Sequence, residues 1–346
     1  MEYAKQLQSQ AEQMKSYLQD ASIQTGGNLL LNAGGEEIQN LSLDVGKNVT
    51  VQAPDARKLI LRSLGQNLNL KKIEIAEDAK VEILADGNVI NAQNQTDSDA
   101  NLSLLISADS ITINSLDGNI GTNKSPITLK VKKIDSAMGK DIYITNEGDL
   151  LIGNIHANPE TGSVHLRIIG NLSGEEAEHL ITGGSIELNV TGNVGSTKTP
   201  IRTNTDRLII KARKINIDNT ALRVDISDTS GNDVSIKTDG HLFGERVVAR
   251  NLIIWAAGNI LLTATVSGDV ELESLYGEIT FLNAYRLPDD LDGEDEDSIR
   301  FLKGVTGRNE VVDTGDRTDL VLWLLLMLVA VGIMVWQIRS CRRVRR

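Results

Sequence analysis

Apolar residues alternate with polar ones along most of this chain. From about residue 26 to residue 285, apolar-x-apolar triplets such as Val81/Ile83 and Ile111/Ile113 recur almost without pause, and Gly, Asn, Asp and Ser separate them. A period of two, interrupted by turn-forming residues, is typical of short β-strands that bury one face. The sequence therefore predicts many short strands, with no helical period between them.

The strand-rich region also matches itself. Three pairs of segments align: 117–127 (DGNIGTNKSPI) with 191–201 (TGNVGSTKTPI), 162–174 with 232–244, and 190–194 with 256–260. The offset between partners falls from 74 in the first pair to 70 in the second and 66 in the third. We interpret the drifting offset as one repeating unit with small loop insertions, divided into three or four coils of about 18 to 24 residues each.

This repeat predicts an all-β fold, a parallel β-helix (β-solenoid) over residues 25–285. Each coil would stack about 4.8 Å above the previous one, with Val, Ile and Leu in a shared core. Gly and Asn would form the corners, because both tolerate positive φ, and stacked Asn side chains would form ladders. A pair of β-sandwiches is the alternative, although sandwich strands are usually longer.

The two ends of the chain have other patterns. Residues 1–24 carry apolar residues at spacings of three and four, which predicts a short amphipathic helix that caps the solenoid or ends a stalk. Residues 286–318 are acidic and polar, and we expect a solvated spacer. An EF-hand placed on Gly293 would put Pro288 first and Ile299 twelfth, and neither residue can bind Ca²⁺.

Residues 319–338 contain an unbroken apolar run from Leu320 to Trp336, long enough to cross a bilayer as one transmembrane helix. Trp323 and Trp336 lie near its two ends, where aromatic rings prefer the interface. A basic tail, residues 339–346, follows, with Arg339, Arg342 and Arg343 among its five arginines. We expect this tail to be cytoplasmic and the body extracellular. A buried core helix is the alternative.

Export of the body requires a signal, but residues 1–20 are polar and do not resemble a signal peptide. We therefore expect the chain to be the C-terminal portion of a longer secreted protein, or to have a misassigned start. A tail-anchored protein with a cytosolic body is the alternative, but it would have to translocate five arginines.

The charge and composition of the chain argue against several classes of function. The formal net charge is −12 and aromatic residues make up 3% of the chain, so we expect no nucleic-acid partner. The single cysteine, Cys341, lies in the basic tail, where it is either acylated or an ordinary tail residue. We expect no disulfide, metal or cofactor. His156, His165, His179 and His241 are scattered, and no Gly-x-Ser-x-Gly motif is present.

The GNIGT…PI and GNVGS…PI motifs, with the run GDVELESLYGEITF at Gly268 to Phe281, resemble the β-helical repeats of filamentous-haemagglutinin-like bacterial surface proteins. The resemblance covers about residues 26–285. It implies an extended bacterial surface stalk or adhesin. Such a protein would have a cell-wall or host-surface ligand that the sequence does not identify.

The segment before the apolar run resembles a Gram-positive cell-wall sorting signal, Leu-Pro-x-Thr-Gly followed by a membrane span and a basic end. The five positions here are Val311, Val312, Asp313, Thr314 and Gly315, so the proline is missing. If the signal works, a sortase would cut between Thr314 and Gly315. A plain membrane anchor is the alternative.

Together these features predict a single-pass, membrane-anchored bacterial surface stalk or adhesin without catalysis. One competing hypothesis is a carbohydrate-active β-helix enzyme, a lyase or hydrolase. We do not favour it because the exposed positions carry dispersed Asn, Ser, Thr, Lys and Glu rather than repeated acidic pairs. The other is a fragment of a larger surface protein with no function of its own.

Overall fold

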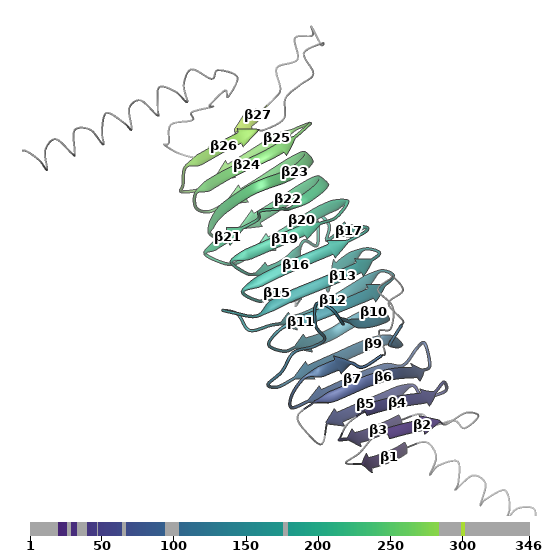
Figure 1. The fold of residues 1–346 in the computed structure, drawn as a ribbon. Coiled ribbons are helices and arrows are strands. Elements are labelled where there is room, and N and C mark those ends of the chain that lie inside the picture. Colours follow the sequence, from purple (N-terminus) through teal and green to yellow (C-terminus); the bar gives the residue numbers. More distant parts are fainter. Residues whose placement is uncertain are drawn as a thin grey trace, which may run out of the picture. The chain divides into compact units, whose positions relative to one another are not determined.

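The structure, a computed structural model, describes residues 20–25, 29–32, 40–46, 48–63, 67–93, 104–175, 179–283 and 299–301. Within these ranges the chain forms an all-β parallel β-solenoid of about 11 turns. Its coils stack in chain order from β1 to β27 (Figure 1). The predicted β-solenoid is confirmed, and the β-sandwich alternative is wrong.

The described residues contain 27 strands, most of them short. They are β1 (Asp20–Thr25), β2 (Leu29–Asn32), β3 (Asn40–Val45), β4 (Asn48–Ala53), β5 (Lys58–Ser63), β6 (Leu68–Ile75), β7 (Lys80–Ala85), β8 (Val89–Asn91), β9 (Ile106–Ser115), β10 (Ile127–Met138), β11 (Ile142–Glu147), β12 (Leu150–His156), β13 (Ser163–Ile169), β14 (Leu172–Gly174), β15 (Leu180–Thr182), β16 (Ser185–Val190), β17 (Asn193–Val194), β18 (Ile201–Asn204), β19 (Arg207–Lys211), β20 (Lys214–Asn219), β21 (Arg223–Asp225), β22 (Ser230–Thr238), β23 (His241–Ala256), β24 (Ile260–Val266), β25 (Val270–Ser274), β26 (Ile279–Asn283) and β27 (Ile299–Phe301).

All strand pairs are parallel, and their register gives the length of each coil. In the middle of the solenoid, Val164 pairs with Ile186, and the neighbouring contact of His165 with Glu187 has the same sequence separation of 22. Towards the C-terminus, Leu252 pairs with Val270, and the separation falls to 18, as in other contacts between these coils. These steps agree with the predicted coil length. A parallel pair needs a long connection between its strands, and in this fold the rest of the coil supplies it.

The self-match of the sequence does not span a whole number of coils. Ile120, in the first GN motif, lies in the column of stacked strands that continues through Ile142 to Val164. Val194, in the second GN motif, instead follows Leu172, in a different column. The interpretation of the offset as three or four complete coils is therefore wrong. The two motifs match because different corners of a coil need the same residues.

The strands extend beyond the predicted range of 25–285. Strand β1 occupies Asp20–Thr25, where the sequence pattern predicted the end of a helix. Strand β27, Ile299–Phe301, pairs with β25 and lies within the segment predicted as a spacer. Residues 1–19 and most of the predicted spacer lie outside the described residues.

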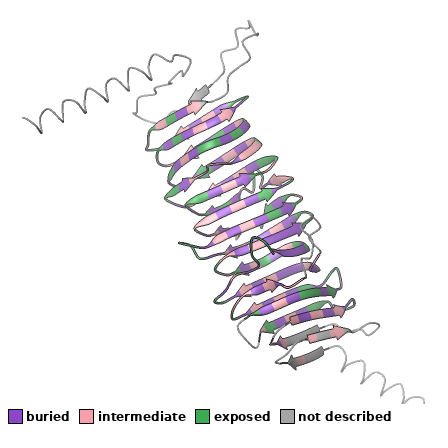
Figure 2. Ribbon diagram, in the orientation of Figure 1, coloured by how far each residue is buried: buried purple, intermediate pink, exposed green. Residues whose placement is uncertain are grey.

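One hydrophobic core runs the length of the described coils. Buried and more exposed residues alternate along the strands (Figure 2), as in the iBiBiB-type burial of Asn48–Ala53. Buried apolar residues from Val45 to Phe281 form a single cluster. Each inward side chain packs on those of the coils before and after it, so burial couples neighbouring coils.

Two asparagines, Asn146 and Asn219, are completely buried in this core with their side chains hydrogen-bonded. The Asn146 side chain accepts the Val131 amide at 3.0 Å and donates to the Val131 carbonyl at 3.2 Å. Asn219 accepts the Thr203 hydroxyl at 2.8 Å and the Thr205 amide at 3.2 Å. Both complete backbone hydrogen bonding inside the solenoid, which would otherwise cost free energy.

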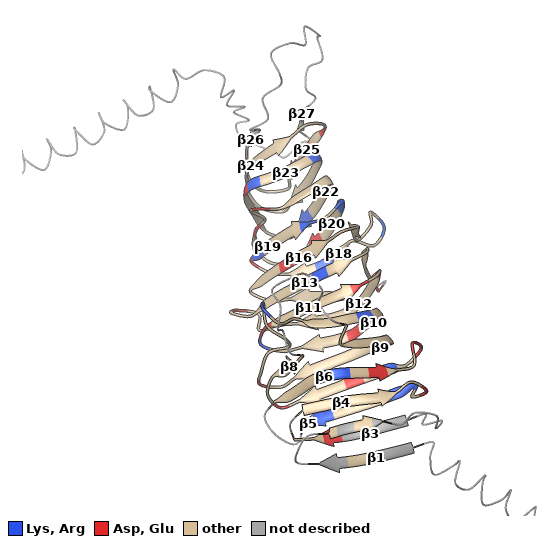
Figure 3. Ribbon diagram, turned by 45° about the vertical axis from the view of Figure 1, so that its right-hand side comes forward, with Lys and Arg blue, Asp and Glu red and all other residues tan. Residues whose placement is uncertain are grey.

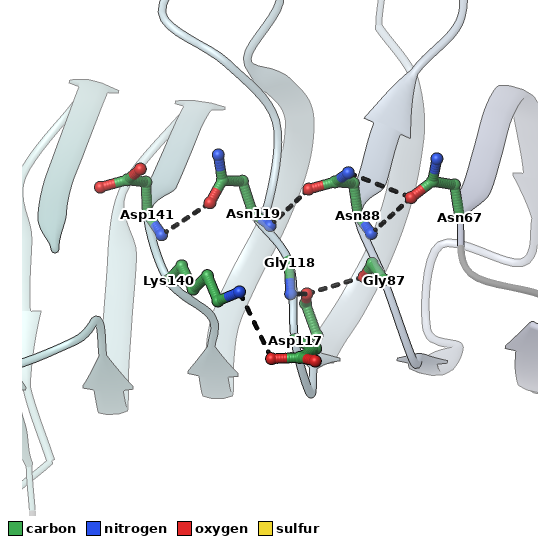
Figure 4. Close-up of polar contacts among 9 residues, drawn as sticks. Asn67, Gly87, Asn88, Asp117, Gly118, Asn119, Lys140 and Asp141 are labelled. Atoms are coloured by element: carbon green, nitrogen blue, oxygen red, sulfur yellow. Dashed lines mark hydrogen bonds and ion pairs between the residues drawn. The ribbon is translucent and has the colours of Figure 1, made fainter.

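Corners are held together by ladders of side-chain hydrogen bonds, as the sequence predicted. Asn67 Oδ1 accepts the Asn88 amide, Asn88 Oδ1 accepts the Asn119 amide, and Asn119 Oδ1 accepts the Asp141 amide (Figure 4). Asp141 in turn accepts the Ser163 amide at 2.8 Å. We call this series the Asn67 ladder. It supplies acceptors to amides at positions where the chain turns between strands.

Other corners have similar ladders of side-chain hydrogen bonds. Asp149 Oδ1 accepts the Asn171 amide, and Asn171 Oδ1 accepts the Asn193 amide. Asp233 accepts a side-chain N–H of Asn251, whose Oδ1 accepts the Asp269 amide. Asp can replace Asn in these ladders because only an acceptor oxygen is required.

The two GN motifs form the same turn. Gly121 and Gly195 have φ values of 67° and 60°, and a Cβ on either would lie 2.7 Å from a backbone oxygen of the next coil. Thr122 and Ser196 then close matching turns by accepting amides three residues ahead. Glycine is required here by both dihedral angle and space.

Replacing the fully buried Ile210 with Asp should place an unpaired charge in the core. We expect a loss of roughly 3–5 kcal/mol in local stability, greatest in adjacent coils and smaller with distance. Hydrogen exchange along the purified chain measures this. The control is Ile209→Lys, which puts a charge on the outward side of the same strand, opposite Glu187. Equal loss of protection from Leu41 to Leu272 would contradict the coupling of nearest neighbours.

Replacing Asn119 with Ala should remove the acceptor of the Asp141 amide. We expect a cost of about 1–2 kcal/mol and faster hydrogen exchange at that amide. Asn119→Asp keeps the acceptor oxygen and should remain close to the wild type. If the Ala and Asp variants lose equal stability, the Asn67 ladder does not act through this hydrogen bond.

Candidate binding surface on the C-terminal coils

The site residues predicted from the sequence lie beyond the described part of the chain. This holds for Thr314 and Gly315 and for the membrane-anchor residues, and the acidic run of residues 289–297, which we do not expect to bind Ca²⁺, lies there too. The predicted anchor residues are Leu320, Trp323, Trp336, Arg339, Arg342 and Arg343. In the ranges that the structure describes, no helix is long and apolar enough to cross a membrane.

The four histidines lie apart in the fold. His165 contacts Glu187 at 3.0 Å and stacks on the Tyr143 ring, with centroids 4.6 Å apart. His179 is buried, and its ring contacts the Glu175 carbonyl and the Arg202 amide. Within the described coils, no three His, Cys, Asp or Glu side chains are grouped closely enough to hold a metal ion.

Basic and acidic residues are spread over the coils (Figure 3), and several of them form ion pairs between neighbouring coils. Both carboxylate oxygens of Asp228 accept hydrogen bonds from Arg246, which lowers the pKa of Asp228. Lys133 contacts Asp135 at 2.7 Å and Glu175 at 2.9 Å, which raises the pKa of Lys133. These exposed pairs help to fix the register of the coils, and each contributes little free energy.

Exposed apolar side chains concentrate near the C-terminal end of the solenoid. Among the described residues, six of the nine large hydrophobic side chains that are exposed lie between residues 222 and 276. They are Leu222, Val248, Ile253, Leu261, Leu275 and Tyr276. Of these, Leu222 and Tyr276 line one hollow of the surface, and contiguous exposed apolar side chains mark interaction sites more often than isolated ones do.

Aromatic rings add to this surface. The Arg223 guanidinium lies 4.5 Å from the Phe243 ring centroid, and the Lys237 ammonium lies 5.2 Å from that of Trp255. Both contacts join a side chain to the equivalent strand one coil further on, as the register of β21 and β22 with β23 requires. These cation–π contacts hold the two rings in place on the outer side of β23.

An open groove of about 500 Å³ crosses four successive corners of these coils, and we call it the corner groove. Leu222 and Tyr276 stand at its two ends, with 82% and 83% of their surfaces exposed. Gly240 and Gly258 lie between them, in the two intervening coils. Asp239 also lines the groove.

The groove has a glycine floor because successive corners touch there. A Cβ on Gly240 would overlap the Leu222 carbonyl group, and one on Gly258 would lie 2.6 Å from the His241 ring. The side chains of His241 and Asn259 meanwhile accept the amides of Asn259 and Glu278. Close stacking of the corners thus leaves a hollow between Leu222 and Tyr276.

Little in the sequence indicates this groove. Trp255 stands out as the one tryptophan before the apolar run, and Tyr276 lies in the LESLYGE segment of the repeat. Neither position shows that Leu222 and Tyr276, three coils apart, stand above the same corner. That follows only from the short coils that stack between them.

Comparison with known proteins finds no match: no family model, no curated protein and no solved structure matches the chain. The β-solenoid implied by the resemblance to filamentous-haemagglutinin-like repeats is present.

Replacing Lys214 with Ala should raise the pKa of Asp233, because hydrogen bonds from Lys214 and Asn251 lower it. A lowered carboxyl pKa stabilises the fold above the unfolded pKa, about 3.9, and this stability is lost as pH falls through the folded pKa. We expect Lys214→Ala to have a lower Tm at pH 7, with the difference shrinking below about pH 4. Lys198→Ala is the control, and a pH-independent difference would contradict the assignment.

Proposed function

We propose that the protein is a membrane-anchored bacterial surface stalk or adhesin of the filamentous-haemagglutinin-like type. The observation that carries the proposal is the continuous solenoid. Its core runs from Val45 to Phe281 without a break into separate domains. An unbroken stack of coils suits the task of holding a binding surface away from the cell envelope.

The direction of the hydrogen bonds supports this role. In a parallel β-solenoid the backbone bonds between coils run along the solenoid axis, and the Asn67 ladder adds side-chain bonds in the same direction. A pull along the axis therefore loads many bonds between each pair of coils together. The net charge of −12 favours a hydrated surface that does not self-associate.

The C-terminal sequence supports the location. The apolar run from Leu320 to Trp336 and the five arginines that follow it suit a single span with a cytoplasmic tail. The preceding Thr314 and Gly315 keep part of a sorting signal, so processing by a sortase is the finer version of the same proposal. We do not propose the carbohydrate-active enzyme, because no observation on the described coils favours it.

The topology can be tested with the single native cysteine. In intact cells, a membrane-impermeant maleimide should label Lys198→Cys in a Cys341→Ser background, because Lys198 lies on an exposed turn of the solenoid. Native Cys341 should be labelled only after lysis, with hydroxylamine added to free any acylated thiol. Labelling of Cys341 in intact cells, with protection of the thiol introduced in place of Lys198, would falsify the proposed orientation.

A further inference from the structure

We infer that the corner groove binds an extended peptide segment that carries a lysine or arginine. This inference deepens the proposed adhesin function by naming the chemistry of the partner. Three properties of the groove lead to it: its length, the nature of its lining and the charge of the coils around it.

The length of the groove suits a short extended segment. Leu222 is followed at the same corner by Gly240, Gly258 and Tyr276, one coil apart each. Three steps of about 4.8 Å separate the two projecting side chains by roughly 14 Å. A polyproline-type peptide rises about 3.1 Å per residue, so about four or five residues fill this distance.

The lining favours apolar side chains over a sugar. Leu222 and the Tyr276 ring offer apolar contact, and the glycine floor lets a peptide backbone approach closely. His241 Nδ1 and Asn259 Oδ1 already accept backbone amides of the next coil. A neutral oligosaccharide needs many directed hydrogen bonds, and each of these two acceptor atoms already accepts one from the backbone. Peptides that dock on aromatic-lined grooves need few such bonds.

The charge of the surrounding coils favours a cationic group. Counted over all faces of the coils, residues 222–283 carry nine acidic side chains and four basic ones, and Asp239 is the acidic residue that lines the groove. Two of the basic side chains, Lys237 and Arg246, contact Asp218 and Asp228, and Arg223 lies over the Phe243 ring. Asp239 is exposed in the groove, and among the described residues no cationic side chain forms an ion pair with it. Its carboxylate is therefore available to a cationic partner.

The test uses the purified full-length chain in detergent micelles and a fluorescent hexapeptide library in which one position at a time is fixed. Sublibraries fixed as Lys or Arg should bind more tightly than those fixed as Glu. Tyr276→Ala should weaken this binding about tenfold, because an aromatic anchor often contributes about 1.4 kcal/mol or more. Leu116→Ala removes another exposed apolar side chain, outside the groove, and should change nothing.

Charge reversal provides the sharper test. Asp239→Lys should reverse the preference, so that Glu-fixed peptides bind more tightly than Lys-fixed ones. Both Asp239 and Tyr276 are exposed, so these variants should fold, and an unchanged Tm and circular dichroism spectrum check this.

Three outcomes would overturn the inference. The first is that no sublibrary binds the wild type more tightly than Tyr276→Ala. The second is that the preference for charge is the same in Asp239→Lys. The third is that neutral oligosaccharides of glucose or N-acetylglucosamine bind in a Tyr276-dependent manner and the peptides do not. Because the assay uses purified protein, its failure leaves the thiol-labelling result unaffected, and the converse also holds.

Discussion

Everything in this fold depends on the pairing of each coil's backbone amides with acceptors in the coil next to it. Along the strands, the parallel register provides those acceptors automatically. At the corners the chain turns away from the ladder, and side chains such as Asn88 and Asn119 take over. A coil that lost this match would leave amides without partners, so the requirement constrains the sequence at the corners that carry these ladders.

The same requirement does not restrict the side chains that point outward. In the C-terminal coils several of these outward side chains are apolar. Where the coils are short, glycine corners stack in direct contact, and Leu222 and Tyr276 project on either side of them. The rigid backbone thus brings together residues that no local motif connects. The corner groove is a product of the stacking, with the chemistry supplied by a few exposed side chains.

Much of the fold could be predicted from the sequence, because burial and turns leave periodic marks. The alternation at Ile111/Ile113 and the glycines of the GN motifs each report a local constraint, and the structure confirms both. The number of coils spanned by the self-match was wrongly interpreted. Gly121 and Gly195 form the same tight turn, but the two turns lie in different columns of stacked strands. The groove could not be predicted, since it depends on how many residues each intervening coil contains.

The two GN motifs lie in different columns of the solenoid, and this shift affects where a repeated binding surface would lie around the axis. A segment that repeats after several coils plus part of another returns at a different column, as Val194 does relative to Ile120. If chains of this kind lengthen by copying such segments, each copy faces another direction around the axis. A surface patch carried by the copied segment would then occur on several sides of the solenoid. A partner could bind it from more than one direction around the axis.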